Sequence, residues 1–200
     1  MSTPTIRLAT SADSDAILAI YAPYIQTPIT FEEEVPTHAA FQERTNGILA
    51  SHPYLVAEQD GHVIGYAYAH ELRERIAYQW NAELSVYLAP AAQGHGLGSA
   101  LYQALINLCA AQGIKAVYGI VTSPNTPSEH LHRAFGFEVM GLQRRAGFTC
   151  GAWHDVTWYV KYLTDTFEEN PAAPIAFPAL CVQRENDVRR VLAEANERVR

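Results

Sequence analysis

Three glycines, Gly94, Gly96 and Gly98, stand just before a segment with helical periodicity. From Ser99 onward apolar residues recur on one face of a helix, and Gly113 marks its end. Glycines let the backbone pass close to a bulky group, and the N–H groups and dipole at a helix start favour an anion. This stretch predicts a site for a phosphate or pyrophosphate, with a purely structural glycine turn as the alternative.

The spacing of these glycines narrows the class of ligand. It fits neither the six-residue Rossmann fingerprint nor a P-loop, which would need Gly-Lys-Ser/Thr. It does fit Gln-x-x-Gly-x-Gly, at Gln93, Gly96 and Gly98. In this respect the stretch resembles the pyrophosphate loop of the GNAT superfamily of acyl-CoA N-acyltransferases.

Composition bounds the remaining possibilities. The 200 residues are 48% hydrophobic and 18% charged, which is typical of one soluble globular domain. The net charge of −7 argues against general binding to nucleic acid or membrane surfaces, so we expect neither partner. Cys109, Cys150 and Cys181 lack metal-site spacing, so we expect reduced thiols and no metal. The first residues do not resemble a signal peptide and no apolar run has transmembrane length, which favours the cytoplasm.

The elements that must position the loop alternate between strand and helix patterns. The clearest strand signals are the Asp60-Gly61 hairpin turn and the apolar run that begins at Glu83. The predicted order is β-α-α-β-β-β-α-β-α-β-β, an α+β fold whose central sheet carries helices on both faces. Strand segments are expected over residues 5–9, 54–58, 62–69, 83–88, 115–121, 137–140, 145–149 and 153–162, where 137–140 and 145–149 count as one strand of that order. Helices are expected over 10–24, 37–51, 99–112 and 128–135.

The chain changes character after Thr164. We expect one domain over residues 1–163, followed over 164–200 by a proline-rich connector and a short C-terminal helix. Pro171, Pro174 and Pro178 favour an extended connector. A short charged helix is expected from about Asn186, and the sequence leaves open whether it packs on the domain, packs on a partner subunit or frays.

A more specific resemblance covers about residues 5–163. Seven ordered stretches are similar to the phosphinothricin N-acetyltransferase family, whose relatives acetylate methionine sulfoximine and methionine sulfone. This resemblance implies a GNAT-type mixed sheet, a homodimer, and transfer of an acetyl group from acetyl-CoA to an amine. The stretches are residues 30–34, 53–58, 65–68, 77–80, 83–87, 131–137 and 151–156.

The resemblance also assigns catalytic roles. It makes Glu83 the base that removes a proton from the amine, and it gives His132 the protonation of the departing thiolate, or a part in the base machinery. A carboxyl group with an ordinary pKa of about 4.3 is a weak base for an ammonium. Glu83 would therefore need apolar neighbours such as Trp80, or a relaying water, to act at neutral pH. The alternative for both residues is a satisfied polar side chain.

Binding residues follow from the same resemblance. The strand backbone at Val86, Tyr87 and Leu88 should pair with the pantetheine amides, with one N–H polarising the thioester oxygen. The pyrophosphate would lie on the glycine loop, and two further positions would touch the cofactor from the opposite side. The loop residues are Gln93, Gly94, His95, Gly96, Leu97, Gly98 and Ser99, and the two further positions are Asn125 and Ser128.

The acceptor residues lie on two loops. Arg73, Arg75 and Tyr78 fall where the family holds an amino acid carboxylate and its phosphinate or sulfoximine oxygens, and a planar guanidinium can hold two such oxygens at once. Phe31 would supply an apolar wall. A solvated loop is the alternative for both arginines.

Some features depart from the family pattern or fall outside it. His95 stands where the family often has a basic residue. Thr122, Ser123 and Arg145 replace smaller or more apolar residues. Three other histidines are interpreted as structural or surface residues, namely His62, His70 and His154.

Taken together, these features predict an acetyl-CoA-dependent N-acetyltransferase of a small amino acid analogue of the phosphinothricin, methionine sulfoximine or methionine sulfone type. One alternative is acetylation of another small amine or of a protein N-terminus. A second alternative is a catalytically silent CoA-binding regulatory module.

Overall fold

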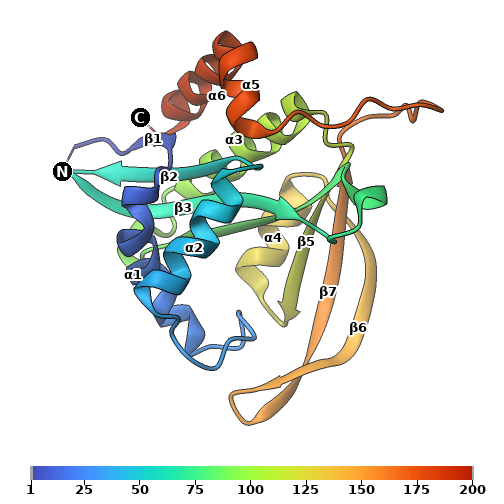
Figure 1. The fold of residues 1–200 in the computed structure, drawn as a ribbon. Helices are drawn as coiled ribbons and strands as arrows, with labels where there is room; N and C mark the ends of the chain where they lie inside the picture. Colours follow the sequence, from blue (N-terminus) through green and yellow to red (C-terminus); the bar gives the residue numbers. More distant parts are fainter. Residues whose placement is uncertain (1, 200) are drawn as a thin grey trace.

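The computed structural model describes residues 2–199, and within that range the chain forms one seven-stranded sheet (Figure 1). The strand order is β1-β2-β3-β4-β5-β7-β6, and every neighbouring pair is antiparallel except β4–β5. The sheet is therefore mixed, as expected. The strands are β1 Thr5–Leu8, β2 Tyr54–Gln59, β3 His62–Glu71, β4 Asn81–Leu88, β5 Ala116–Ser123, β6 Glu138–Thr149 and β7 Ala152–Tyr162.

Helices cover both faces of this sheet, so the predicted fold class is confirmed. Alternate residues of β2 point to opposite faces. Tyr54 and Val56 join a core with α1 and α2, whereas Leu55 and Ala57 join a larger core built around α3. The helices are α1 Ser14–Ile25, α2 His38–Leu49, α3 Leu97–Gln112, α4 Thr126–Ala134, α5 Phe177–Gln183 and α6 Glu185–Arg198, with short 3-10 turns at Ser11–Asp13, Ile76–Tyr78 and Pro90–Ala92.

The strands β4 and β5 diverge at the centre of the sheet. Their parallel ladder runs only from Asn81 opposite Ala116 to Glu83 opposite Tyr118. Beyond that point β4 continues to Leu88 paired with β3, while β5 continues paired with β7. One backbone edge of β4 is thus open after Glu83, and the positions expected to bind the cofactor lie along it.

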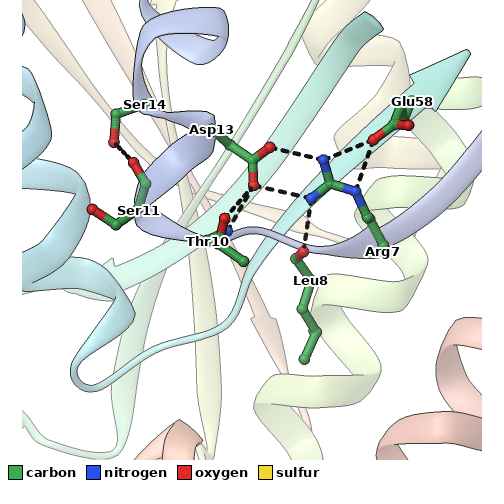
Figure 2. Close-up of polar contacts among 7 residues, drawn as sticks. All are labelled: Arg7, Leu8, Thr10, Ser11, Asp13, Ser14 and Glu58. Carbon is green, nitrogen blue, oxygen red and sulfur yellow. Dashed lines mark hydrogen bonds and ion pairs between the residues drawn. The ribbon is translucent and has the colours of Figure 1, made fainter. Parts of the chain in front are cut away.

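An ion-pair network fixes the start of α1 to the sheet edge. Figure 2 shows Arg7 of β1 between two carboxylates, with its guanidinium 2.7 and 2.9 Å from the oxygens of Asp13 and 2.8 and 2.9 Å from Glu58. Asp13 also accepts the backbone N–H of Thr10 at 2.7 Å. The guanidinium of Arg7 holds the pKa of Asp13 below its ordinary value. This network joins β1, β2 and α1 at one point.

The C-terminal tail packs on the domain and shares its core. The side chains of Phe177, Leu180 and Val191 are buried in the α3 core, and α6 lies along α3 and the edge of the sheet (Figure 1). The sequence pattern predicts an extended connector through Pro178, but α5 begins there instead. Proline fits the first turn of a helix, where its missing N–H costs nothing, and Pro178 lies in the first turn of α5.

The helix expected from about residue 186 is present as α6, which is longer than the short helix predicted. Asn196 of α6 bonds both backbone groups of Ile6 on β1, accepting its N–H at 2.7 Å and donating to its carbonyl at 2.9 Å. Helices α5 and α6 are therefore integral to the fold rather than an appendage. Within residues 2–199, no helix combines the length and apolar character that crossing a membrane requires.

The buried tail predicts a stability difference within α5. Leu180 is 0% exposed and Val182 is 82% exposed. We expect Leu180→Ala to lower the free energy of unfolding by about 2–5 kcal/mol because it opens a cavity. Val182→Ala, the matched control, should change it by less than about 0.5 kcal/mol. Urea unfolding followed by circular dichroism measures both, and equal midpoints would show that α5 does not belong to the cooperative core.

Candidate active site

The glycine loop presents its backbone to open space at the start of α3. Gly94 and Gly96 have φ of 82° and 80°, in the left-handed region that favours glycine. A Cβ added at either position would meet no atom within 4 Å. Gly96 caps α3, so the N–H groups of Leu97, Gly98 and Ser99 have no partner within the helix. This geometry suits a bound anion.

The other loop residues are held in different ways. Leu97 buries its side chain in the core, so only its backbone is available to a ligand, whereas His95 is exposed. The amide of Gln93 donates to the hydroxyl of Tyr24 at 3.1 Å, and that hydroxyl donates to the carbonyl of Leu88 at 2.7 Å. Tyr24 of α1 thus ties the end of β4 to the glycine loop. Periodicity alone could not predict this role, because it places Tyr24 on the apolar face of a helix with other core residues.

The open edge of β4 leads into this loop. Val86, Tyr87 and Leu88 pair with Ala67, Tyr66 and Gly65 on β3, and they lie beyond the last β5 pair. An extended strand with one free edge can hydrogen-bond an extended chain of amides as a further strand would.

Glu83 lies where β4 and β5 part. Its side chain is 22% exposed, and burial raises the pKa of the carboxyl group, opposed in part by the charge of His70. Oε2 of Glu83 is 3.7 Å from Nε2 of His70. A carboxylate with a raised pKa is a better base near neutral pH, so burial supplies what the chemistry requires.

His132 is enclosed in the α3 core and only 4% exposed. Its Nδ1 donates to the carbonyl of Ser128 at 2.7 Å, so Nε2 accepts the hydroxyl of Tyr102 at 2.9 Å. The ring stacks on Tyr159, and burial lowers the pKa of His132. The neutral ring carries no proton on Nε2. This arrangement argues against direct proton donation from Nε2 to the thiolate, which is one of the two roles that the family resemblance implies for His132.

The remaining residues expected at the cofactor have structural partners. Asn125 is the N-cap of α4, and its Oδ1 accepts the N–H of Ser128 at 3.3 Å. The N–H of Asn125 donates to Glu129 at 3.2 Å. Both residues lie at the start of α4, after the end of β5, on the far side of the opening from β4.

The acceptor residues lie on exposed loops. The guanidinium of Arg73 lies 5.2 Å from the ring centre of Tyr78, and Arg75 is exposed beside them. Phe31 packs on the β6–β7 hairpin, where a Cβ at Gly147 would come within 2.7 Å of its ring. Among residues 2–199, no hydrogen bond or ion pair joins either arginine to Glu83.

Comparison with protein families decides the class. Residues 6–158 match the family model of the acetyltransferase (GNAT) domain. The chain belongs to the GNAT acetyltransferase family. It is 37% identical over 171 residues to a phosphinothricin N-acetyltransferase of Streptomyces viridochromogenes, covering 85% of this chain and 93% of that one. It is 35% identical to an L-methionine sulfoximine/L-methionine sulfone acetyltransferase of Pseudomonas paraeruginosa, covering 81% and 96%.

A solved structure agrees with this acetyltransferase in fold. The phosphinothricin acetyltransferase of Sinorhizobium meliloti, crystallised with acetyl-CoA, is 37% identical and superposes with a TM-score of 0.80 over 86% of this chain and 94% of that one. The family resemblance inferred from the seven sequence stretches is therefore confirmed. Among residues 2–199 of the acetyltransferase, no three His, Cys, Asp or Glu side chains are grouped to hold a metal ion.

Two residues of this acetyltransferase gain a place in the site that sequence reasoning did not give them. His70, interpreted from the sequence as structural or surface, lies opposite Glu83. Tyr102 holds His132. The register of β3 against β4 would have revealed His70, but a nine-residue connection separates these strands and leaves that register unspecified by any tight turn.

The glycine geometry predicts a selective loss of coenzyme A binding. Gly96→Val places a branched side chain at a left-handed position in the loop, so we expect CoA affinity to fall at least about tenfold. Gly61→Val is the matched control, because Gly61 has φ of 78° and also faces open space, but in the β2–β3 turn. Both variants should lose about 1–2 kcal/mol of stability. Calorimetric titration with CoA separates them, and equal affinities would exclude this loop as the phosphate site.

Proposed function

We propose that this acetyltransferase transfers the acetyl group of acetyl-CoA directly to the amino group of a small amino acid analogue. Phosphinothricin, methionine sulfoximine and methionine sulfone are the leading acceptors, because relatives that share a third of the sequence carry those names. The observation that carries the proposal is Glu83, a carboxylate whose pKa is raised by burial, at the point where β4 and β5 separate.

The residues around the opening fit acetyl-CoA. The free edge of β4 at Val86, Tyr87 and Leu88 would hold the pantetheine amides, and the N–H groups from Gln93 to Ser99 would hold the pyrophosphate. Asn125 and Ser128 would contact the cofactor from the α4 side. When bound, acetyl-CoA supplies an activated acetyl group as a thioester.

The chain's own residues would act as follows. Glu83 takes a proton from the ammonium of the acceptor, which leaves a neutral amine able to attack a carbonyl. A backbone N–H of β4 polarises the carbonyl oxygen and stabilises its negative charge as attack proceeds. His132, whose neutral Nε2 accepts the buried hydroxyl of Tyr102, would hold α4 beside the site rather than give a proton to the thiolate.

The acceptor would lie between the loop after α1 and the segment before β4. Arg73 and Arg75 suit the carboxylate and the tetrahedral oxygens of the acceptor, because each guanidinium can hold two oxygens. Tyr78 orients Arg73, and Phe31 would form an apolar wall from the side of the β6–β7 hairpin.

We also infer a homodimer that works in the cytoplasm. β6 is the last strand of the sheet, and Val139, Met140 and Leu142 on it are exposed. Exposed apolar side chains on an edge strand favour contact with another chain. The cytoplasm suits Cys109, Cys150 and Cys181, which are free thiols.

A panel of amines tests the function. We expect acetyl-CoA-dependent thiol release with phosphinothricin, methionine sulfoximine and methionine sulfone, and little with ordinary amino acids or peptides. Release with peptides alone would keep the acetyl transfer and overturn the proposed acceptor. Bound CoA without release for any amine would favour a silent CoA-binding module.

Glu83→Gln is the variant to run beside that panel. Turnover should fall by about a hundredfold or more, because the amide cannot accept a proton, while CoA affinity stays near normal. In the native enzyme kcat/KM should rise with pH as the carboxyl group of Glu83 ionises. The Glu83→Gln variant should not show this rise. Full activity of the variant would exclude Glu83 as the base.

The dimer proposal predicts a second difference between matched variants. Leu142→Glu on β6 should give a monomer by light scattering, because a charge at the centre of an apolar contact is costly to bury. Val182→Glu makes the same change at an exposed apolar residue on α5 and should leave a dimer. A native protein that is monomeric would contradict the proposal.

A further inference from the structure

His70 and Glu83 are direct cross-strand partners on β3 and β4. Directly opposed residues of an antiparallel pair point to the same face of the sheet, which brings Nε2 of His70 to 3.7 Å from Oε2 of Glu83. Nδ1 of His70 lies 2.9 Å from the carbonyl oxygen of Glu71. That oxygen can only accept, so Nδ1 carries a proton. The neutral ring therefore turns the lone pair of Nε2 toward the carboxyl group.

The surroundings make His70 the outer member of this pair. Its side chain is 33% exposed, against 22% for Glu83. The ring of Tyr68 stacks on one side of the imidazole, with the ring centres 5.7 Å apart and an angle of 29° between the ring planes. His52, before β2, is close enough for the charge of His70 to lower its pKa. Glu83, Tyr68 and His52 are thus titratable groups beside His70, and Glu83 is the one close to Nε2.

We propose that His70 takes from Glu83 the proton that Glu83 removes from the amine, and passes it to solvent. The step is balanced: a proton moves from nitrogen of the ammonium to a carboxylate oxygen, then from that oxygen to Nε2, which leaves an imidazolium and a carboxylate. The imidazolium then gives the proton to water. At 3.7 Å the second transfer needs a small movement of either side chain or one bridging water.

Proton transfer to His70 would overcome a disadvantage of a buried base. A base with a raised pKa accepts a proton readily but returns it slowly to water, so turnover benefits from a neighbour that accepts it. A protonated His70 also lowers the pKa of Glu83, which returns the carboxyl group to its ionised form. His70 acts through Glu83 and is therefore a positioning residue. The inference rests on the proposed role of Glu83 as the base.

The test compares His70→Asn with His62→Asn, since His62 lies exposed at the far end of the same strand. Loss of the proton acceptor beside Glu83 should lower kcat about tenfold, and the deficit should shrink as a small diffusible buffer is added at fixed pH. The affinity for CoA should not change. His62→Asn should follow the native enzyme at every buffer concentration. A His70→Asn variant that matches the native enzyme, or whose deficit is the same at every buffer concentration, would overturn the proposal.

Two further measurements separate a relay from a structural effect. The carboxyl group of Glu83, labelled with ¹³C and assigned through Glu83→Gln, should titrate at higher pH in His70→Asn than in the native protein, without acetyl-CoA present. Free imidazole should restore activity to His70→Ala and do nothing for His62→Ala. An unmoved carboxyl titration or an absent rescue would exclude the relay.

These outcomes also distinguish failure of the proton relay from failure of Glu83 as the base. If Glu83→Gln is fully active, the base role fails and the relay fails with it. If Glu83→Gln is inactive while His70→Asn behaves as the native enzyme, only the relay is overturned.

Discussion

The site depends on one backbone constraint, the end of the β4–β5 ladder at Glu83. Within a sheet nearly every buried N–H and carbonyl needs a partner. Where two central strands part, their inner edges must meet solvent or a bound chain of similar polarity. The opening is held from both sides, because Tyr24 fixes the end of β4 and the cluster of His132 and Tyr102 fixes α4 against α3. The carboxyl group of Glu83, the proposed base, lies where the two strands part.

The face of the sheet that carries Glu83 explains why the pKa of its carboxyl group is raised. Tyr66, Tyr68 and His70 of β3 follow one another on one face of the sheet. On β4, Tyr87 lies opposite Tyr66, and Glu83 lies opposite His70. The rings form a mostly buried stack under α1 and α2, and the stack ends at the imidazole and the carboxylate. Glu83 is thus partly withdrawn from water, while His70 remains near it. Burial and proton exchange with solvent are divided between two neighbouring residues.

Much of the fold and of the candidate site was predictable from the sequence because it depends on local patterns. Periodicity predicts the helices and strands, and the spacing of Gly94, Gly96 and Gly98 predicts a loop with an open backbone at the start of α3. What could not be predicted depends on tertiary register. His70 becomes a partner of Glu83 only through the pairing of β3 with β4, and His132 meets Tyr102 only once α4 packs on α3. The tail was underestimated because prolines favour both extended segments and helix starts, and only packing distinguishes the two.

The amide of Asn196 has a consequence for how the protein behaves in a crowded solution. By offering one donor and one acceptor to Ile6, it occupies the outer side of β1 as the next strand of a sheet would. A foreign strand cannot add at that position without displacing α6. The C-terminal helix thus blocks edge-to-edge pairing at β1, and a chain shortened before α6 would leave that edge open to another strand.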